Sequence, residues 1–241
     1  VSKLEAVLDE LVQAHPMLRA TISADLTQRV LSDVPPVSVP IIDLSDLDTE
    51  QAESRWDALV EVASHQVLDA DTWPLFDVRA VKMSGGEYRV TLGIDLLIAD
   101  AVSIKIVVHQ LLSRYFDVTG PVSPPALTFR DVVMHRQAIL AGPRRARAEA
   151  YWLDRLETLP PAPRLPMAKS AAAIEQARFE RRAFVLDSTK WRRLQSYAAA
   201  HDVTPASALL AAYARVLSLW ASSDEFLINL TVMDRTPLRP V

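Results

Sequence analysis

The feature that most constrains the fold is an abrupt change of hydrophobic period between residues 88 and 115. From Tyr88 to Asp95, apolar and polar residues alternate with a period of two, as in a β-strand with one apolar face. After Asp100 the apolar residues fall at helical spacing: Ile104, Val107, Val108, Leu111, Leu112 and Tyr115. Strands and helices of this kind are mixed along the whole chain, so we expect an α/β fold with both hairpins and crossovers.

The join between the two periods, "GIDLLIADAVS" at residues 93–103, holds two aspartates inside an apolar run. Charged groups near a core need partners or a function. Asp100 precedes the helix and is placed to cap its N-terminus. Asp95 lies near the end of the strand, where a cap is not needed. Two carboxylates five residues apart could share an acid/base site, although their spacing alone does not establish one.

The same patterns predict the other elements of the first part of the chain. They are a helix that ends at His15-Pro16, strands at 18–23 and 29–32, an extended segment at 34–45, a helix at 50–66 capped by Asp48 or Thr49, a hairpin at 76–95 that turns at Ser84-Gly85-Gly86, and helices at 128–141 and 145–159.

A Pro-rich connector at 159–166, "LPPAPRLP", separates these elements from the rest. Beyond it we expect strands at 179–186 and 225–232. Between them we expect a helix at 188–200 and a second helix capped by Thr204, with Pro205 in its first position.

Composition excludes several kinds of site. The chain has no cysteine, so disulfides, thiol nucleophiles and thiolate metal sites are excluded. The formal net charge is -4 with interspersed signs, which excludes a nucleic-acid footprint, and we interpret the densest basic stretch, 142–150, as a solvated helix face. No signal peptide and no apolar run of membrane-spanning length is visible, so we expect a cytoplasmic protein without a membrane partner.

Histidine, the usual base near neutral pH, offers no clear constellation. None of the histidines neighbours another or lies between residues 93 and 103, and we expect all of them to be structural or solvated. No spacing suggests a metal site, and five glycines in the whole chain leave no phosphate-binding loop. The histidines are His15, His65, His109, His135 and His201.

Six blocks in the expected order resemble the condensation-type domains of nonribosomal peptide synthetases. "DLLIADAVS" at 95–103 is similar to the DxxxxD signature of the heterocyclization subclass, which replaces the HHxxxDG of ordinary condensation domains. The other blocks are "AHPMLRATI" (14–22), "WPLFDVRA" (73–80), "YWLDRLETLPPAPRLPM" (151–167), "TPASALLAAYARVLSLW" (204–220) and "FLINLTVMDRTPLRP" (226–240). By these blocks the chain is identified as a member of the heterocyclization subclass.

The resemblance implies a two-lobed fold like that of chloramphenicol acetyltransferase, with the active site in a tunnel between the lobes. Residues 1–166 match the N-terminal lobe without its first elements, and residues 167–241 match the crossover and the beginning of a truncated C-terminal lobe. The family's first motif would precede Val1, and its later motifs, which include the residues credited with cyclodehydration, would follow Val241.

The resemblance also implies the chemistry. In this subclass a carrier-bound acyl thioester is condensed with carrier-bound Ser, Thr or Cys, and loss of water then closes an oxazoline or thiazoline, as in some siderophore pathways. No cofactor is bound directly, since phosphopantetheine on donor and acceptor carrier proteins brings the substrates. Adjacent synthetase domains are the other expected partners. Plain condensation without ring closure, a non-catalytic carrier-docking scaffold and, more distantly, a carboxylate hydrolase remain alternatives.

The resemblance assigns site residues by position. Asp95 and Asp100 match the signature and are the catalytic candidates, Ser103 is a candidate for the substrate tunnel, and Asp100 is expected to form a salt bridge with Arg235. Leu96 stands where an ordinary condensation domain has its histidine, so positioning and electrostatics must carry the condensation. Two positions depart from the family pattern and receive no role: Asp234 for the usual Asn and Arg239 for the usual His.

Overall fold

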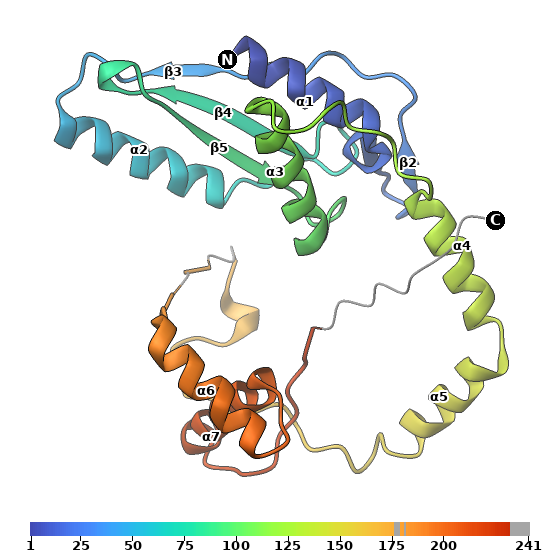
Figure 1. The fold of residues 1–241 in the computed structure, drawn as a ribbon. Coiled ribbons are helices and arrows are strands. Elements are labelled where there is room, and N and C mark those ends of the chain that lie inside the picture. Colours follow the sequence, from blue (N-terminus) through green and yellow to red (C-terminus); the bar gives the residue numbers. More distant parts are fainter. Residues whose placement is uncertain (176–178, 181, 232–241) are drawn as a thin grey trace. The chain divides into compact units, whose positions relative to one another are not determined.

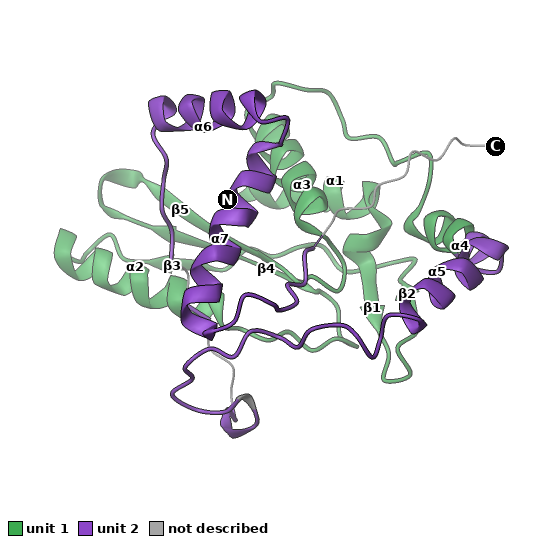
Figure 2. Cartoon of the chain, turned by 90° about the horizontal axis from the view of Figure 1, so that it is seen from below, with its two compact units in different colours: residues 1–136, 238–241 green, residues 137–237 purple. Residues whose placement is uncertain are grey.

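The computed structural model describes residues 1–175, 179–180 and 182–231 (Figure 1). The chain divides into two compact units, coloured separately in Figure 2. Val1–Arg136 belongs to the first unit, and the second begins at Gln137, inside helix α4 (Phe129–Leu140). The boundary between these compact units is not the lobe boundary that we expect after residue 166. That lobe boundary stays a prediction.

A three-stranded sheet forms the centre of the first unit. Its order is β3 (Ile41–Asp43), β4 (Phe76–Lys82) and β5 (Tyr88–Ile94), with β3 parallel to β4 and β4 antiparallel to β5. A parallel pair needs a crossover connection, and α2 (Thr49–Ser64) supplies it between β3 and β4. The expected extended segment and helix are therefore joined in a βαβ unit.

The predicted hairpin is confirmed. Gly85 and Gly86, between β4 and β5, have φ angles of 72° and 80°, a backbone region that glycine enters without steric cost. Register then places Val78 opposite Leu92, and Phe76 opposite Ile94. The turn fixes this register, and register decides which side chains of β5 face the core.

Smaller elements at the N-terminus also match the sequence patterns. Helix α1 (Ser2–Ala14) ends at His15, directly before Pro16, because proline disfavours helical backbone in the residue that precedes it. Strands β1 (Ala20–Ile22) and β2 (Gln28–Val30) form a separate antiparallel pair.

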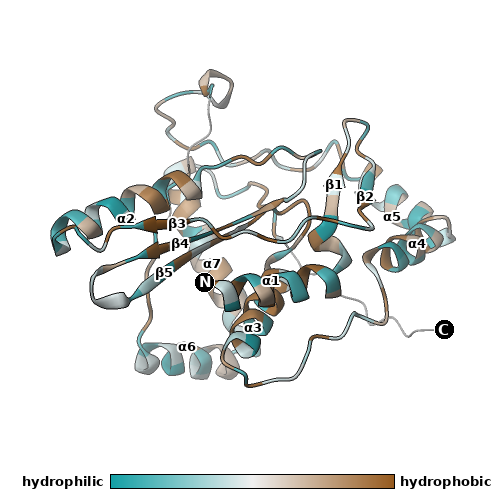
Figure 3. Ribbon diagram, turned by 90° about the horizontal axis from the view of Figure 1, so that it is seen from above, coloured by the Kyte–Doolittle hydropathy of each residue, from teal (hydrophilic) through white to brown (hydrophobic). Residues whose placement is uncertain are grey.

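Helices lie on opposite faces of the sheet (Figures 1 and 3), and an apolar cluster fills the space on each face. On one face α1 and α3 (Ala101–Tyr115) pack on the side chains of Phe76, Val78 and Ala80. On the other, α2 packs on Val81, one register position further along β4. The central strand β4 thus buries Phe76, Val78 and Ala80 on one face and Val81 on the other, because successive side chains of a strand point to opposite faces.

Ion pairs tie the helices of the first unit to their neighbours. The Glu10 carboxylate on α1 accepts hydrogen bonds from the Arg114 guanidinium on α3 at 2.9 Å and from the Val122 N–H at 2.6 Å. These donors hold the pKa of Glu10 below its usual value. On the other face, Glu53 of α2 binds Arg89 of β5 through two hydrogen bonds of 2.7 Å.

Three helices of the second unit follow the predictions, although the first is shorter than expected. Helix α5 (Pro143–Leu153) ends well before residue 159, where the pattern placed its end. Helix α6 (Ser188–Ala200) begins after Asp187, whose carboxylate accepts the N–H groups of its first turn. Helix α7 (Pro205–Ala221) is capped by the Thr204 hydroxyl and starts with Pro205, as predicted.

The strands predicted at 179–186 and 225–232 are wrong for the residues that the structure describes there. Residues 179–180, 182–186 and 225–231 have no regular secondary structure. A strand exists only through hydrogen bonds to a neighbouring strand, and no β-pairing joins these segments to another described segment. Alternating apolar residues are therefore not sufficient for a strand.

Taken singly, no helix among the described residues is long and apolar enough to cross a membrane. Helices α6 and α7 reach the required length and composition only as a pair, and that pair is bent by 97°.

Candidate active site

Asp95 closes a tight turn at the end of β5. Its backbone N–H donates to the Leu75 carbonyl at 3.0 Å, which extends the pairing of β5 with the start of β4. Its carboxylate Oδ1 accepts the N–H of Leu97 at 2.9 Å, and its carbonyl accepts the N–H of Ile98 at 3.1 Å. The half-buried Asp95 side chain thus forms an Asx-type turn.

This turn corrects the expectation that no cap is needed at Asp95. The chain reverses from strand to helix within six residues, Asp95 to Asp100, and the first N–H groups of that reversal have left the sheet. An aspartate carboxylate two residues before such an N–H satisfies it locally. The sequence signal was present, as aspartate at a strand end before a turn.

Asp100 caps helix α3, as predicted. Its Oδ1 accepts the N–H of Ser103 at 2.7 Å, and its backbone is extended, with φ -82° and ψ 172°. Ser103 therefore lies in the first turn of α3 and is half-buried. A carboxylate at this position also interacts favourably with the positive end of the helix dipole.

The two carboxylates are thus both engaged with backbone. One oxygen of Asp95 and one of Asp100 each accept an N–H from the residue two or three positions ahead. Both aspartates therefore shape the backbone that joins β5 to α3, whatever else they do. Arg235, the expected partner of Asp100, lies outside the described residues, as do Asp234 and Arg239, so that salt bridge stays a prediction.

The histidines behave as structural or surface residues. His15 lies 2.6 Å from the Gln110 amide oxygen and links the end of α1 to α3. The Nδ1 atoms of His65 and His201 lie within 2.9 Å and 2.8 Å of helical carbonyls one turn earlier. His109 and His135 are exposed. In the part of the chain that the structure describes, no group of three or more His, Asp or Glu side chains could hold a metal ion.

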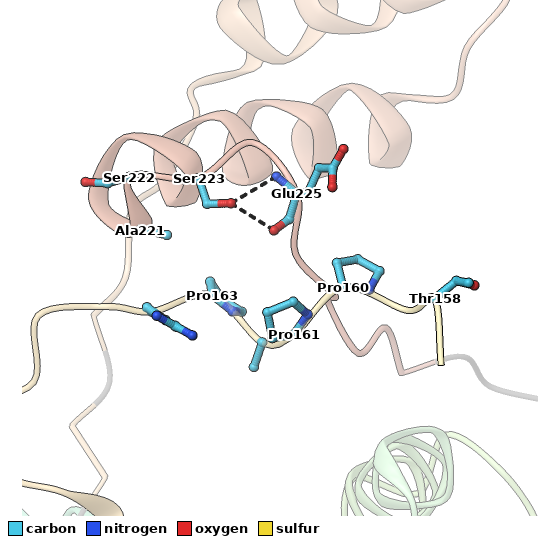
Figure 4. Close-up of a pocket in the computed structure, with 10 residues that line it drawn as sticks. Thr158, Pro160, Pro161, Pro163, Ala221, Ser222, Ser223 and Glu225 are labelled. Carbon is cyan, nitrogen blue, oxygen red and sulfur yellow. Dashed lines mark hydrogen bonds between the residues drawn. The ribbon is translucent and has the colours of Figure 1, made fainter. Parts of the chain in front are cut away.

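Two cavities among the described residues are lined by none of the candidate site residues. In the first unit, the apolar core around Leu11, Phe76 and Val107 leaves a gap of about 10 Å³, which is at most one water in size. In the second unit, a cavity of about 370 Å³ lies between Pro160–Arg164 and the end of α7 (Figure 4). The Leu227 N–H donates to the Pro161 carbonyl at 3.0 Å beside it. The sequence marked this proline run as a connector and as part of a family block, but not as the lining of a cavity.

The sequence of the chain is similar to those of known proteins. The family model described as "Condensation domain" matches residues 1–238. Pyochelin synthetase PchE of Pseudomonas aeruginosa is 39% identical over 233 residues, which cover 97% of this chain and 16% of that protein. Phenyloxazoline synthase MbtB of Mycolicibacterium paratuberculosis is 33% identical over 245 residues, which cover 99% of this chain and 20% of that protein.

A solved structure agrees with these relatives. The EpoB cyclization-docking bidomain of the nonribosomal peptide synthetase from Sorangium cellulosum superposes with a TM-score of 0.85 at 31% identity, covering 94% of this chain and 45% of that one. The chain therefore spans less than half the length of each of these proteins. The expected α/β condensation-domain fold is confirmed by this likeness. The chain belongs to the condensation domain family of nonribosomal peptide synthetases.

Proposed function

We propose that the chain is part of a heterocyclization domain, which condenses a carrier-bound acyl thioester with carrier-bound Ser, Thr or Cys and then closes the ring. The observation that carries the proposal is the "DLLIAD" turn. Asp95 and Asp100 stand at the strand-to-helix join, and Leu96 occupies the position of the histidine in ordinary condensation domains. Similarity to a phenyloxazoline synthase and to a cyclization domain supports the same reaction.

The reaction needs no external oxidant or activated nucleotide. The amine nitrogen of the acceptor attacks the thioester carbonyl carbon; the C–N bond forms, the C–S bond breaks, and the departing thiolate takes the amine proton. The side-chain oxygen or sulfur then adds to the new amide carbonyl. The former carbonyl oxygen leaves as water with one proton from the hydroxyl or thiol and one from the amide nitrogen. An oxazoline or thiazoline remains.

The proposal gives each site residue a role. Asp95 lies near the substrates and fixes the turn with one carboxylate oxygen, which leaves the other for hydrogen bonding to a reacting group. Asp100 fixes the start of α3 and, by the proposal, pairs with Arg235. Ser103, in the first turn of α3, lines the substrate tunnel. Donor and acceptor carrier proteins are the proposed partners, and phosphopantetheine is theirs rather than this chain's.

Intact mass spectrometry of the acceptor carrier tests the proposal. The full-length protein is incubated with an acyl-loaded donor carrier and with an acceptor carrier loaded with Ser, Thr or Cys. We expect a condensed product one water lighter than the linear amide. Linear amide alone indicates plain condensation, and binding of carriers without any transfer indicates a docking scaffold.

Two variants separate the chemical role of Asp95 from its turn. Asp95→Asn keeps an acceptor oxygen for the Leu97 N–H, whereas Asp95→Ala removes it. If the carboxylate takes part in the reaction, both variants lose cyclized product. If it only holds the turn, Asp95→Asn stays close to wild type and Asp95→Ala alone is impaired.

A further inference from the structure

The turn that Asp95 closes holds an aliphatic side chain out of the core. Leu96 is 76% exposed, although Ile98 and Ala99, only two and three residues later, are buried. Backbone hydrogen bonds from Asp95 to Leu75 and from Ile98 to Asp95 bracket Leu96 on both sides. The Leu97 N–H, bound to the Asp95 carboxylate, fixes the same segment from within.

Single exposed leucines are common on protein surfaces and need no explanation alone. Leu96 differs in its place rather than in its backbone. Leu26 is 85% exposed in a hydrogen-bonded turn as well, but only the turn of Leu96 adjoins Asp95, a candidate site residue. Binding sites are lined mostly by apolar side chains, with a few polar groups placed among them.

A leucine side chain in such a site can do only two things. It cannot transfer a proton or donate a hydrogen bond, so it contributes by contact with apolar groups and by excluding water. The acceptor amino acids, Ser, Thr and Cys, present a polar group to the reaction. The acyl group of the donor thioester is the substrate part whose apolar atoms can gain from contact with Leu96.

We infer that Leu96 is a specificity-determining residue, which contacts the acyl group of the donor thioester and favours bulky apolar donors over small ones. This inference rests on the proposed function and adds a residue to it. The Asp95 turn exposes the Leu96 side chain, and contact with this side chain discriminates between donor acyl groups.

The test compares two donors in the full-length protein. Donor carriers are loaded with a benzoyl or an acetyl group and the acceptor carrier with serine, threonine or cysteine in turn, and amide formation is followed by intact mass spectrometry. In Leu96→Ser we expect kcat/KM for the benzoyl donor to fall about tenfold relative to the acetyl donor, the scale on which apolar pockets discriminate. Leu96→Met, which conserves apolar volume, should keep the wild-type preference.

Leu26→Ser is the matched control, because Leu26 is also a highly exposed leucine in a turn, outside the candidate site. It should leave the benzoyl-to-acetyl ratio unchanged. An unchanged ratio in Leu96→Ser overturns the inference, and so does an equal loss with both donors, which would assign Leu96 to the turn or to carrier docking. A wild-type protein that forms no amide from either donor overturns the proposed function, and this inference with it.

Discussion

Residues 1–136 and residues 137–231 contain helices of similar length but bury very different amounts of apolar surface. Among the described residues, the buried apolar side chains of the first region form two clusters around the sheet, whereas the second region buries only Ala198 and Ala221. Helix α7 is the clearest case, since most of its large apolar side chains remain exposed: Leu209, Tyr213, Val216, Leu219 and Trp220.

The difference shows that helix formation and core formation depend on different residues. A helix can be marked by its own cap and by apolar spacing within a few turns, and each region contains capped helices: α2 and α3 in the first, α6 and α7 in the second. A core needs side chains from distant segments, and among the described residues only those of the first region bring such segments together in a sheet. We therefore expect the free energy of unfolding to depend on core residues of the first region and on few residues of the second.

Truncating one leucine in each region gives the largest contrast. Leu11 of α1 is 0% exposed, so Leu11→Ala should lower the free energy of unfolding by about 2–5 kcal/mol through lost burial and a cavity. Leu219 of α7 is 68% exposed, and Leu219→Ala should change it by less than about 0.5 kcal/mol. Urea unfolding followed by circular dichroism measures both. Equal losses would show that the second region has a core of its own.

Removing an ion pair should also lower the free energy of unfolding more in the first region than in the second, but by less than removing a core leucine. Glu10→Ala removes the acceptor of both the Arg114 guanidinium and the Val122 N–H, and should destabilise by about 1–2 kcal/mol. Glu180, paired with Arg182 at 3.3 Å in the second region, is solvent-exposed, so Glu180→Ala should leave the urea midpoint unchanged. If Glu10→Ala leaves the free energy of unfolding unchanged, water replaces both hydrogen bonds without cost.

The pH dependence of stability sharpens this point. Donors from Arg114 and Val122 lower the pKa of Glu10 in the folded protein. As the pH falls through the ordinary glutamate pKa of about 4.3, the unfolded chain takes up the proton first, so this contribution is complete above that range and is lost below it. Glu10→Gln should therefore flatten the fall of the urea midpoint below about pH 5. The same slope in both proteins would assign acid sensitivity to other carboxylates.

Helix caps should show no contrast between the regions. Asp48 caps α2 in the first region, and Thr204 caps α7 in the second; each accepts a backbone N–H of the first helical turn. Because a cap acts on its own helix, Asp48→Ala and Thr204→Ala should each cost about 1 kcal/mol in helix stability. Amide hydrogen exchange in the first turns of α2 and α7 measures it. A much smaller effect at Thr204 would mean that α7 frays even with its cap.

The sequence by itself determined the features that depend on neighbours along the chain. The helix at Asp100, the cap at Thr204 with Pro205 behind it, and the Gly85-Gly86 turn are local, and the structure confirms each. The family could also be identified from the order of its motifs, because motifs are stretches of sequence and can be found without a structure.

Tertiary structure decided what depends on segments far apart. The parallel pairing of β3 with β4, the two-sided burial of β4, and the absence of strands among the described residues of 179–186 and 225–231 all depend on which backbones meet. Asp95 belongs to both groups. Its position before a turn is written in the sequence, but its need for an N–H partner arises only where β5 leaves the sheet, because a donor released from pairing must find another acceptor.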